Sequence, residues 1–217
     1  MMDQALLQAV GLSRAFGDLQ AVRPTQFGIL AGEIIVLTGP NGAGKTTLLQ
    51  CLSGLLRPTS GNVLVEGFDL YKEEVAAKER LAFVPDVPRF YPELTAWEHL
   101  HFIGMAYRVT QEWEARAETL LQEFNLWDAR DFYPHNLSHG MRLKLGLILA
   151  LMRPFKVLLL DEPTSALDAE SVGLVITKLI DLRDHGCAVL VSSHDLSMLE
   201  ALKCRQWRMM HGQLETG

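Results

Sequence analysis

A glycine-rich segment constrains the fold of this 217-residue chain more than any other feature. The segment, Gly-Pro-Asn-Gly-Ala-Gly-Lys-Thr at 39–46, follows the β-branched run at 34–37 and precedes a helical pattern at 47–52. A short apolar run favours a buried strand, and glycines before a helical pattern favour a tight loop. The sequence therefore predicts a strand–loop–helix unit in an α/β core.

The same segment has the spacing G-x-x-x-x-G-K-[ST] of a phosphate-binding loop. Glycines let backbone N–H groups turn toward phosphate oxygens, and a helix N-terminus favours negative charge. Lys45 would reach the outer phosphates and Thr46 would hold Mg²⁺. The alternative, a chance glycine-rich turn, is disfavoured by the strand before it and the helix after it. Nucleotide contacts are expected from Gly39, Pro40, Asn41, Gly42, Ala43, Gly44, Lys45, Thr46 and Thr47.

A second apolar run, 157–160, ends in two carboxylates, Asp161 and Glu162. Open α/β sheets bind ligands at the carboxyl ends of their strands. Asp161 therefore suits the Mg²⁺ shell, and Glu162 suits polarising an attacking water. An apolar strand that ends in Asp-Glu is also common for structural reasons, so the interpretation depends on the phosphate-binding loop.

A helical region interrupts the β/α pattern. Strands are expected at 10–16, 34–37, 62–66, 81–84, 157–160 and 188–191, helices at 47–52, at 168–179 with Asp168 as its cap, and at 196–202, and a terminal hairpin at 206–214. Between them, Thr95-x-x-Glu98 is a capping box, a second helix is expected near Thr110 and a third at Ser138. We therefore predict one domain, 1–217, with a core of 1–92 and 154–217 and an inserted helical lobe of 93–153.

The bulk composition excludes several classes of protein. Apolar residues make up 48% and charged residues 21%, which is an ordinary globular composition. The net charge of −6 and the absence of a basic stripe predict that the chain does not bind nucleic acid. The N-terminus lacks the features of a signal peptide, and the apolar runs are too short to cross a membrane. Three cysteines without C-x-x-C spacing predict free thiols in a reducing cytosol.

Three further short motifs complete a family pattern. They are Leu-Ser-His-Gly-Met at 137–141, Ser-Ala-Leu-Asp at 165–168, and His194 just after a predicted strand. In this order, with the loop and the acidic pair, they resemble the nucleotide-binding domain of ABC (ATP-binding cassette) ATPases over nearly the whole chain. The resemblance implies a P-loop NTPase core with a mostly parallel sheet, an N-terminal antiparallel β part and an inserted helical subdomain. It also implies ATP hydrolysis, with ATP and Mg²⁺ bound.

The resemblance implies a role for each motif. Two such subunits pack head to tail, so that Ser138, His139 and Gly140 address the γ-phosphate held by the partner cassette. Asp168 lies at the seam of that dimer. His194 contacts the γ-phosphate and the attacking water, unless it is a core histidine.

Phe16 matches the aromatic position that stacks on adenine, and stacking needs only a ring face. The alternative for Phe16 is an aromatic packed in a turn.

The chain departs from the family pattern at three positions. Asp86 replaces a glutamine that helps to bind Mg²⁺ and couples the core to the helical lobe, and a carboxylate is also a hard oxygen ligand. His139 replaces a glycine and Met141 replaces a glutamine.

A separate pattern, His99-x-His101, could suggest a metal pair. Residues two apart on a helix point to different faces, however, which favours packed or solvated histidines.

The resemblance also indicates a partner. The Pro- and aromatic-rich stretch 88–97 corresponds to the groove that takes a coupling helix of an integral membrane permease. Its sequence is similar to ATP-binding subunits of bacterial exporters of the Ecs type. We therefore expect a cytoplasmic motor subunit, peripheral on the inner face of the cell membrane, paired with a second ABC ATPase subunit. The alternatives are a soluble non-transport ABC ATPase and a nucleotide-sensing cassette with weak hydrolysis.

Overall fold

The computed structural model describes residues 5–109, 113–194 and 196–216. The chain divides into two compact units. The first comprises Met1–Phe83, Phe155–Glu162 and Ile176–Gly217, and the second comprises Val84–Pro154 and Pro163–Val175. The predicted helical lobe, 93–153, lies within the second unit.

An antiparallel sheet forms the N-terminal part of the first unit. Its strands, in the order β2-β1-β4-β5, are β2 (Leu19–Ile29), β1 (Leu7–Phe16), β4 (Ser60–Val65) and β5 (Phe68–Asp69). Leu7, Ala9 and Leu12 of β1 are fully buried. Pro24 cannot donate a ladder hydrogen bond, and it is accommodated because β2 is an edge strand.

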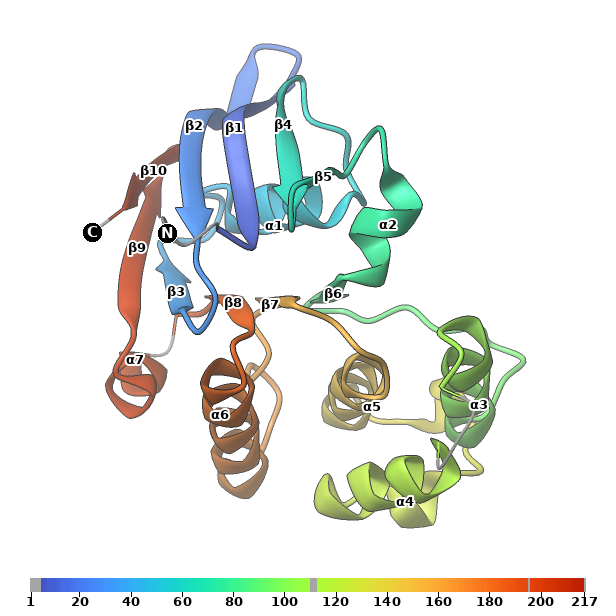
Figure 1. Cartoon of the computed structure of the whole chain (residues 1–217). Helices are drawn as coiled ribbons and strands as arrows, with labels where there is room; N and C mark the ends of the chain where they lie inside the picture. Colours follow the sequence, from blue (N-terminus) through green and yellow to red (C-terminus); the bar gives the residue numbers. More distant parts are fainter. Residues whose placement is uncertain (1–4, 110–112, 195, 217) are drawn as a thin grey trace. The chain divides into compact units, whose positions relative to one another are not determined.

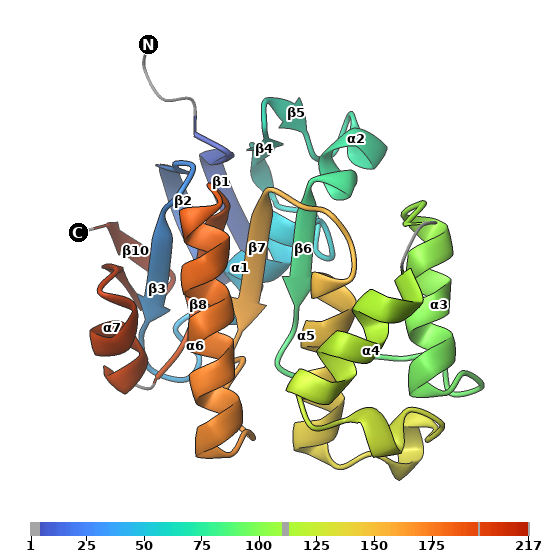
Figure 2. The same cartoon turned by 60° about the horizontal axis from the view of Figure 1, so that its bottom comes forward.

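The first unit also contains a mostly parallel sheet (Figure 2). Its strands, in the order β10-β9-β3-β8-β7-β6, are β10 (Gln213–Thr216), β9 (Arg205–Met210), β3 (Ile34–Thr38), β8 (Ala188–Ser192), β7 (Val157–Asp161) and β6 (Leu81–Val84). β3 pairs in parallel with β8 and β9, and β7 pairs in parallel with β8, whereas β10 runs antiparallel to β9. Every residue of β3, β7 and β8 is buried, as expected for parallel strands covered on both faces.

Helix α1 (Lys45–Ser53) lies between the two sheets of the first unit (Figure 1). It contributes Leu48, Leu49 and Leu52 to a core that both sheets share. Because α1 is covered on both sides, its N-terminal end is held in one place by the packing of the whole unit. Two shorter helices, α2 (Glu74–Glu79) and α7 (Leu196–Leu202), also belong to this unit.

The second unit is helical. It contains α3 (Ala96–Ala106), α4 (Trp113–Glu123), η1 (Trp127–Ala129), η2 (Pro134–Asn136), α5 (His139–Leu151) and the first part of α6 (Ala169–Asp184). The predicted capping box begins α3: Glu98 N donates to Thr95 Oγ1 at 3.2 Å, and Thr95 N donates to Glu98 Oε2 at 2.7 Å. Within the described ranges, no helix of either unit has the length and hydropathy that crossing a bilayer requires.

A cluster of tryptophans packs the helices of the second unit together. The ring centroid of Trp97 lies 5.3 Å from that of Trp113 and 6.1 Å from that of Trp127. His101 stacks on Trp113, with ring centroids 4.8 Å apart. The remaining tryptophan of the chain, Trp207, is buried in the first unit against Phe27.

The structure confirms the predicted fold class. The strands expected at 34–37, 81–84, 157–160 and 188–191, the helices at 47–52 and 168–179, and the terminal hairpin are all present. The helix start predicted near Thr110 falls outside the described residues, and the described helix begins at Trp113. Neither β2 nor α2 was expected from the residue pattern. Pro24 interrupts the strand pattern of β2, and α2 has only six residues, which are too few to show a helical periodicity.

Replacing Thr95 by alanine tests the cap of α3. The substitution removes the acceptor for Glu98 N, so we expect the free energy of unfolding to fall by about 1 kcal/mol. Denaturant unfolding followed by far-UV circular dichroism measures the change. Thr119→Ala is the matched control, because Thr119 is an exposed threonine within α4 whose hydroxyl donates to the Ala115 carbonyl inside the helix. An equal loss in both variants would contradict a specific capping role.

Candidate active site

Close backbone packing shapes the loop between β3 and α1. Gly39 has φ +152°, and a Cβ at this position would overlap the Met209 carbonyl oxygen. Gly44 has φ +108°, and a Cβ there would overlap the Ala21 carbonyl oxygen. These neighbours are main-chain atoms of β9 and β2, which cannot rotate away as a side chain can. The loop therefore needs glycine at both positions for steric reasons.

The turn of the C-terminal hairpin also supports this loop. Gly212 N donates to the Ala43 carbonyl at 2.9 Å, and the Gly212 carbonyl accepts from Arg23 N at 2.8 Å. The sequence indicated only a turn at 211–212. Its hydrogen bond to Ala43 depends on the pairing of β9 with β3, which local sequence does not reveal.

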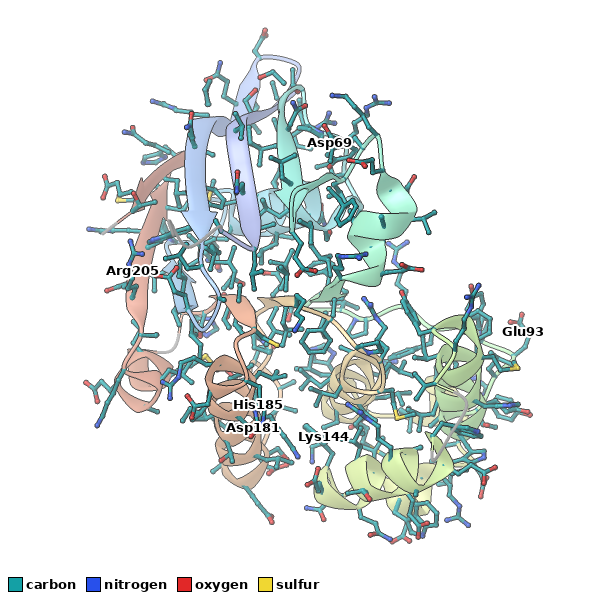
Figure 3. All side chains as sticks on the ribbon, in the orientation of Figure 1. Asp69, Glu93, Lys144, Asp181, His185 and Arg205 are labelled. Carbon is teal, nitrogen blue, oxygen red and sulfur yellow. The ribbon has the colours of Figure 1, made fainter. Side chains whose placement is uncertain are left out.

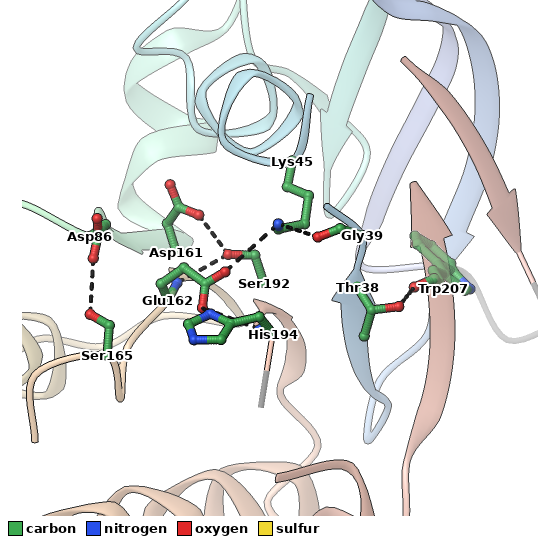
Figure 4. A network of polar contacts seen from close by, with 10 residues as sticks. All are labelled: Thr38, Gly39, Lys45, Asp86, Asp161, Glu162, Ser165, Ser192, His194 and Trp207. Carbon is green, nitrogen blue, oxygen red and sulfur yellow. Dashed lines mark hydrogen bonds and ion pairs between the residues drawn. The ribbon is translucent and has the colours of Figure 1, made fainter. Parts of the chain in front are cut away.

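Lys45 begins α1 and turns its ammonium back over the loop. Its side chain is buried, and Nζ donates to the Gly39 carbonyl at 2.7 Å and lies 3.8 Å from Glu162 Oε1 (Figure 4). The next residue, Thr46, is exposed in the first turn of α1. The remaining predicted loop residues lie beside them: Pro40, Asn41 and Gly42 are exposed, Thr47 is half-buried, and Ala43 is buried.

Asp161 and Glu162 stand at the carboxyl end of β7. Asp161 is only 1% exposed, and Ser192 Oγ donates to its Oδ1 at 2.5 Å. Glu162 N donates to both the carbonyl and the Oγ of Ser192, at 3.1 and 3.0 Å. Ser192 is opposite Asp161 in the parallel pairing of β7 with β8. It is a site residue that sequence reasoning missed, since only the register of the two strands places it there.

Glu162 adopts φ +48°, an uncommon conformation for a residue with a side chain. Its Oε2 lies 2.8 Å from His194 Nδ1 and accepts from His194 N at 3.3 Å (Figure 4). Glu162 is 17% exposed and His194 is 70% exposed. The first unit therefore brings Lys45, Glu162 and His194 into one network of polar contacts, with Asp161 joined to Glu162 through Ser192.

Phe16 ends β1 on the surface of the first unit. It is 46% exposed, and the Arg14 guanidinium lies 4.3 Å from the centroid of its ring. A surface ring that a cation covers on one face is not a core aromatic.

The 137–141 motif begins α5 in the second unit. Ser138 is the N-cap, and its Oγ accepts from Met141 N at 3.2 Å. Ser138 and His139 are exposed. Gly140 lies against the Ala166 carbonyl so closely that a Cβ would meet it at 2.5 Å. The replacement of the family glycine by His139 is therefore accommodated at the surface, whereas position 140 requires glycine.

Asp168 forms an ion pair with Lys144, a residue that sequence reasoning did not single out. Lys144 comes from α5 (Figure 3), its side chain is 11% exposed, and its Nζ lies 3.2 Å from Asp168 Oδ2. Ser171 N donates to Asp168 Oδ1 at 2.9 Å, which confirms the predicted cap of α6, and Ser171 Oγ donates to Oδ2 at 3.0 Å. The bonds from Ser171, helped by Lys144, lower the pKa of Asp168 to about 2.

Asp86 also lies in the second unit, where its Oδ1 accepts from Ser165 Oγ at 3.1 Å. In the His99-x-His101 pattern, His101 is exposed and stacks on Trp113, whereas His99 is packed in the interior. His99 is buried, its Nε2 accepts from Tyr91 N at 3.0 Å, and its Nδ1 lies 2.7 Å from the Thr95 carbonyl. Both ring nitrogens are thereby engaged with the backbone.

A glycine loop that opens a helix, beside one buried and one partly buried carboxylate, is typical of α/β phosphate-binding proteins. Comparisons with known proteins narrow this class. The family model described as ABC transporter matches residues 22–165. The chain is 34% identical over 195 residues to the SkfA peptide export ATP-binding protein SkfE of Bacillus subtilis, covering 89% of this chain and 81% of the relative. It is 35% identical over 214 residues to the spermidine/putrescine import ATP-binding protein PotA of Chromobacterium violaceum, covering 97% of this chain but only 59% of that relative.

The fold comparison agrees with the family model. A solved structure described as the ATP-binding subunit of an ABC transporter aligns with a TM-score of 0.89 and 29% identity, over 97% of this chain and 90% of that one. The chain therefore belongs to the ABC transporter family. It is the ATP-binding subunit of a transporter, and it is an ATP hydrolase. This confirms the resemblance inferred from the ordered motifs.

The Asp168 contacts predict a pH-dependent contribution to stability. The pKa of Asp168 is about 2 in the folded chain and about 3.9 in an unfolded one, so its stabilising effect is present above about pH 4 and disappears toward pH 2. Asp168→Asn should therefore be less stable than the wild type at neutral pH, and the difference should narrow as the pH falls through this window. Urea unfolding between pH 6 and pH 2 measures the difference. A difference that stays constant over the whole range would show that the Asp168 charge contributes nothing.

Proposed function

We propose that this chain is the motor subunit of a bacterial exporter and that the network at the end of β7 carries out hydrolysis. The observation that carries the proposal is the convergence of Lys45, Glu162 and His194 beside the loop at 39–46. Loop N–H groups and the N-terminus of α1 would hold the phosphates of ATP. The phosphate oxygens would replace Glu162 and the Gly39 carbonyl as partners of the Lys45 ammonium, which would release the Glu162 carboxylate for chemistry.

The donor set at this site fits Mg²⁺, which prefers oxygen ligands and keeps several waters. Thr46 offers an exposed hydroxyl, and Asp161 offers a carboxylate whose orientation Ser192 fixes. When bound, Mg²⁺ would neutralise charge on the phosphate oxygens.

Glu162 and His194 would handle the attacking water. Glu162 would accept a proton from it as the general base. The 2.8 Å contact with Nδ1 holds the histidine ring beside the carboxylate, and His194 would contact both the water and the γ-phosphate. Its high exposure supports this role over that of a core histidine. The exposed ring face of Phe16 would stack on the adenine.

A second cassette would complete the site. Ser138, His139 and Gly140 form the N-terminus of α5, where backbone N–H groups favour an anion. Ser138 and His139 are exposed on the second unit and are available to a partner. The γ-phosphate bound by one subunit would thus meet the N-terminus of α5 from the other, so ATP would drive dimerisation.

The exposed residues after Asp86 support a membrane partner. Val87, Tyr91 and Phe102 are 60%, 56% and 41% exposed, and the rings of Tyr91 and Phe102 lie in contact, with centroids 5.5 Å apart. Exposed aromatic groups of this kind are typical of interaction surfaces. We propose that they receive a helix of an integral membrane permease, which would place the subunit on the cytoplasmic face of the membrane. The export direction rests on the resemblance of the stretch 88–97 to subunits of Ecs-type exporters, because the curated relatives include both an export protein, SkfE, and an import protein, PotA.

Glu162→Gln tests the proposed general base. Losing the base should lower kcat about 10²- to 10⁴-fold, while ATP binding is retained because the loop and Lys45 are unchanged. The variant should also accumulate as an ATP-bound dimer, which size-exclusion chromatography with ATP detects. Glu33→Gln is the matched control, since Glu33 is 21% exposed and pairs with Arg205 in the same unit. Full turnover in Glu162→Gln would remove Glu162 from the mechanism.

Lys45→Ala tests the phosphate site. A buried ammonium that contacts phosphate oxygens forms strong charge-assisted hydrogen bonds, so its loss should abolish tight binding of Mg²⁺–ATP in calorimetry. Lys72→Ala is the control, because Lys72 is 75% exposed and pairs only with Asp69 among the ion pairs of the described residues. Wild-type affinity in Lys45→Ala would mean that nucleotide binds elsewhere.

A further inference from the structure

One hydrogen bond joins two places where the chain crosses into the second unit. The first crossing follows Phe83 and the second follows Glu162. Asp86 is the third residue beyond the first crossing (84, 85, 86), and Ser165 is the third beyond the second (163, 164, 165). Ser165 Oγ donates to Asp86 Oδ1 at 3.1 Å (Figure 4). A charge-assisted bond within the second unit therefore ties together the segments that follow both crossings.

The segment that follows Ser165 is held firmly as well. The Ala166 carbonyl packs against Gly140, and Asp168 pairs with Lys144 at 3.2 Å. Both contacts come from α5, so the segment 165–168 is attached to one helix at two positions. The Ser165 hydroxyl adds a third attachment, to the segment that follows β6.

Glu162 is anchored on the other side of the second crossing. Its N–H donates to the carbonyl and the Oγ of Ser192, and its φ of +48° is uncommon. Between Glu162 and Ser165 stand only Pro163, which is buried and has a restricted φ, and Thr164, whose carbonyl accepts from Leu167 N at 3.2 Å. A displacement of Ser165 would therefore reach Glu162 through two residues that have little freedom to absorb it.

We infer that Asp86 is a positioning residue for hydrolysis: through Ser165 it fixes the segment after Glu162, and thereby the placement of the Glu162 carboxylate. The inference rests on the proposed role of Glu162 as the general base. It gives Asp86 a function that does not require it to touch the metal. A carboxylate suits this function because it only accepts hydrogen bonds, so the Ser165 hydroxyl must be the donor.

Four variants test the inference by steady-state ATPase kinetics: Asp86→Ala, Ser165→Ala, the double variant, and Asp86→Asn. A hydrogen bond of ordinary strength corresponds to about a 2- to 10-fold effect. We expect each alanine variant to lower kcat by about this factor with KM for ATP unchanged, because the loop that binds ATP is intact. The double variant should be no slower than either single variant, since both remove the same bond. Asp86→Asn keeps an acceptor oxygen and should retain most of the wild-type kcat.

Two further measurements separate this role from others. If Asp86 acted only as a metal ligand, Asp86→Ala and Asp86→Asn would raise the Mg²⁺ concentration for half-maximal activity, and Ser165→Ala would not. Hydrogen–deuterium exchange, which needs no nucleotide, should be faster at 165–168 in both alanine variants. Thr119→Ala, which removes another exposed hydroxyl of the second unit, should match the wild type in kinetics and in exchange at 165–168.

The outcomes distinguish this inference from the proposed function. Wild-type kcat in Ser165→Ala, beside an impaired Glu162→Gln, would overturn the positioning role and leave the general base in place. Additive effects in the double variant would overturn it too. Full turnover in Glu162→Gln would instead overturn the proposed function, and the positioning role with it.

Discussion

The site depends on a steric constraint: main-chain carbonyls press so closely on the loop between β3 and α1 that two of its positions have no space for a side chain. The carbonyl of Ala21 comes from β2 and that of Met209 from β9, so the shape of the loop is set by segments far apart in the sequence. The hydrogen bond from Gly212 N to Ala43 adds a third support from the terminal hairpin. The loop is therefore a product of the whole first unit, even though its motif is eight residues long.

Strand register sets the second part of the site. β7 and β8 pair in parallel with Asp161 opposite Ser192, so one serine holds the Asp161 carboxylate and the backbone N–H of Glu162. His194 follows two residues after Ser192 and reaches the Glu162 carboxylate from the same strand end. A one-residue shift in this pairing would turn Ser192 to the opposite face of the sheet and would remove its bonds to both acidic residues.

Local sequence predicted the elements that carry strong patterns. The loop at 39–46, the buried strand before it, the helix after it, the cap at Thr95 and the acidic pair are all readable from spacing and residue type. β2 was missed because Pro24 is compatible with a strand only at an edge, and edge position is a tertiary property. Ser192 and Lys144 were missed for a related reason: tertiary structure, not local sequence, determines which groups they contact. Ser165 was recognised only as part of the motif 165–168. The sequence identified Asp86 as unusual but could not reveal its bond to Ser165.

The placement of the tryptophans gives the chain a natural optical label. Trp97, Trp113 and Trp127 lie together in the second unit, whereas Trp207 stands alone of the four in the first, buried beside Phe27. Its carbonyl accepts from the hydroxyl of Thr38, the residue just before Gly39 (Figure 4). Three of the four indole rings that emit in the intact chain therefore belong to the second unit. With those three rings replaced by phenylalanine, the remaining emission would come from a single buried chromophore attached to the strand that leads into the phosphate loop.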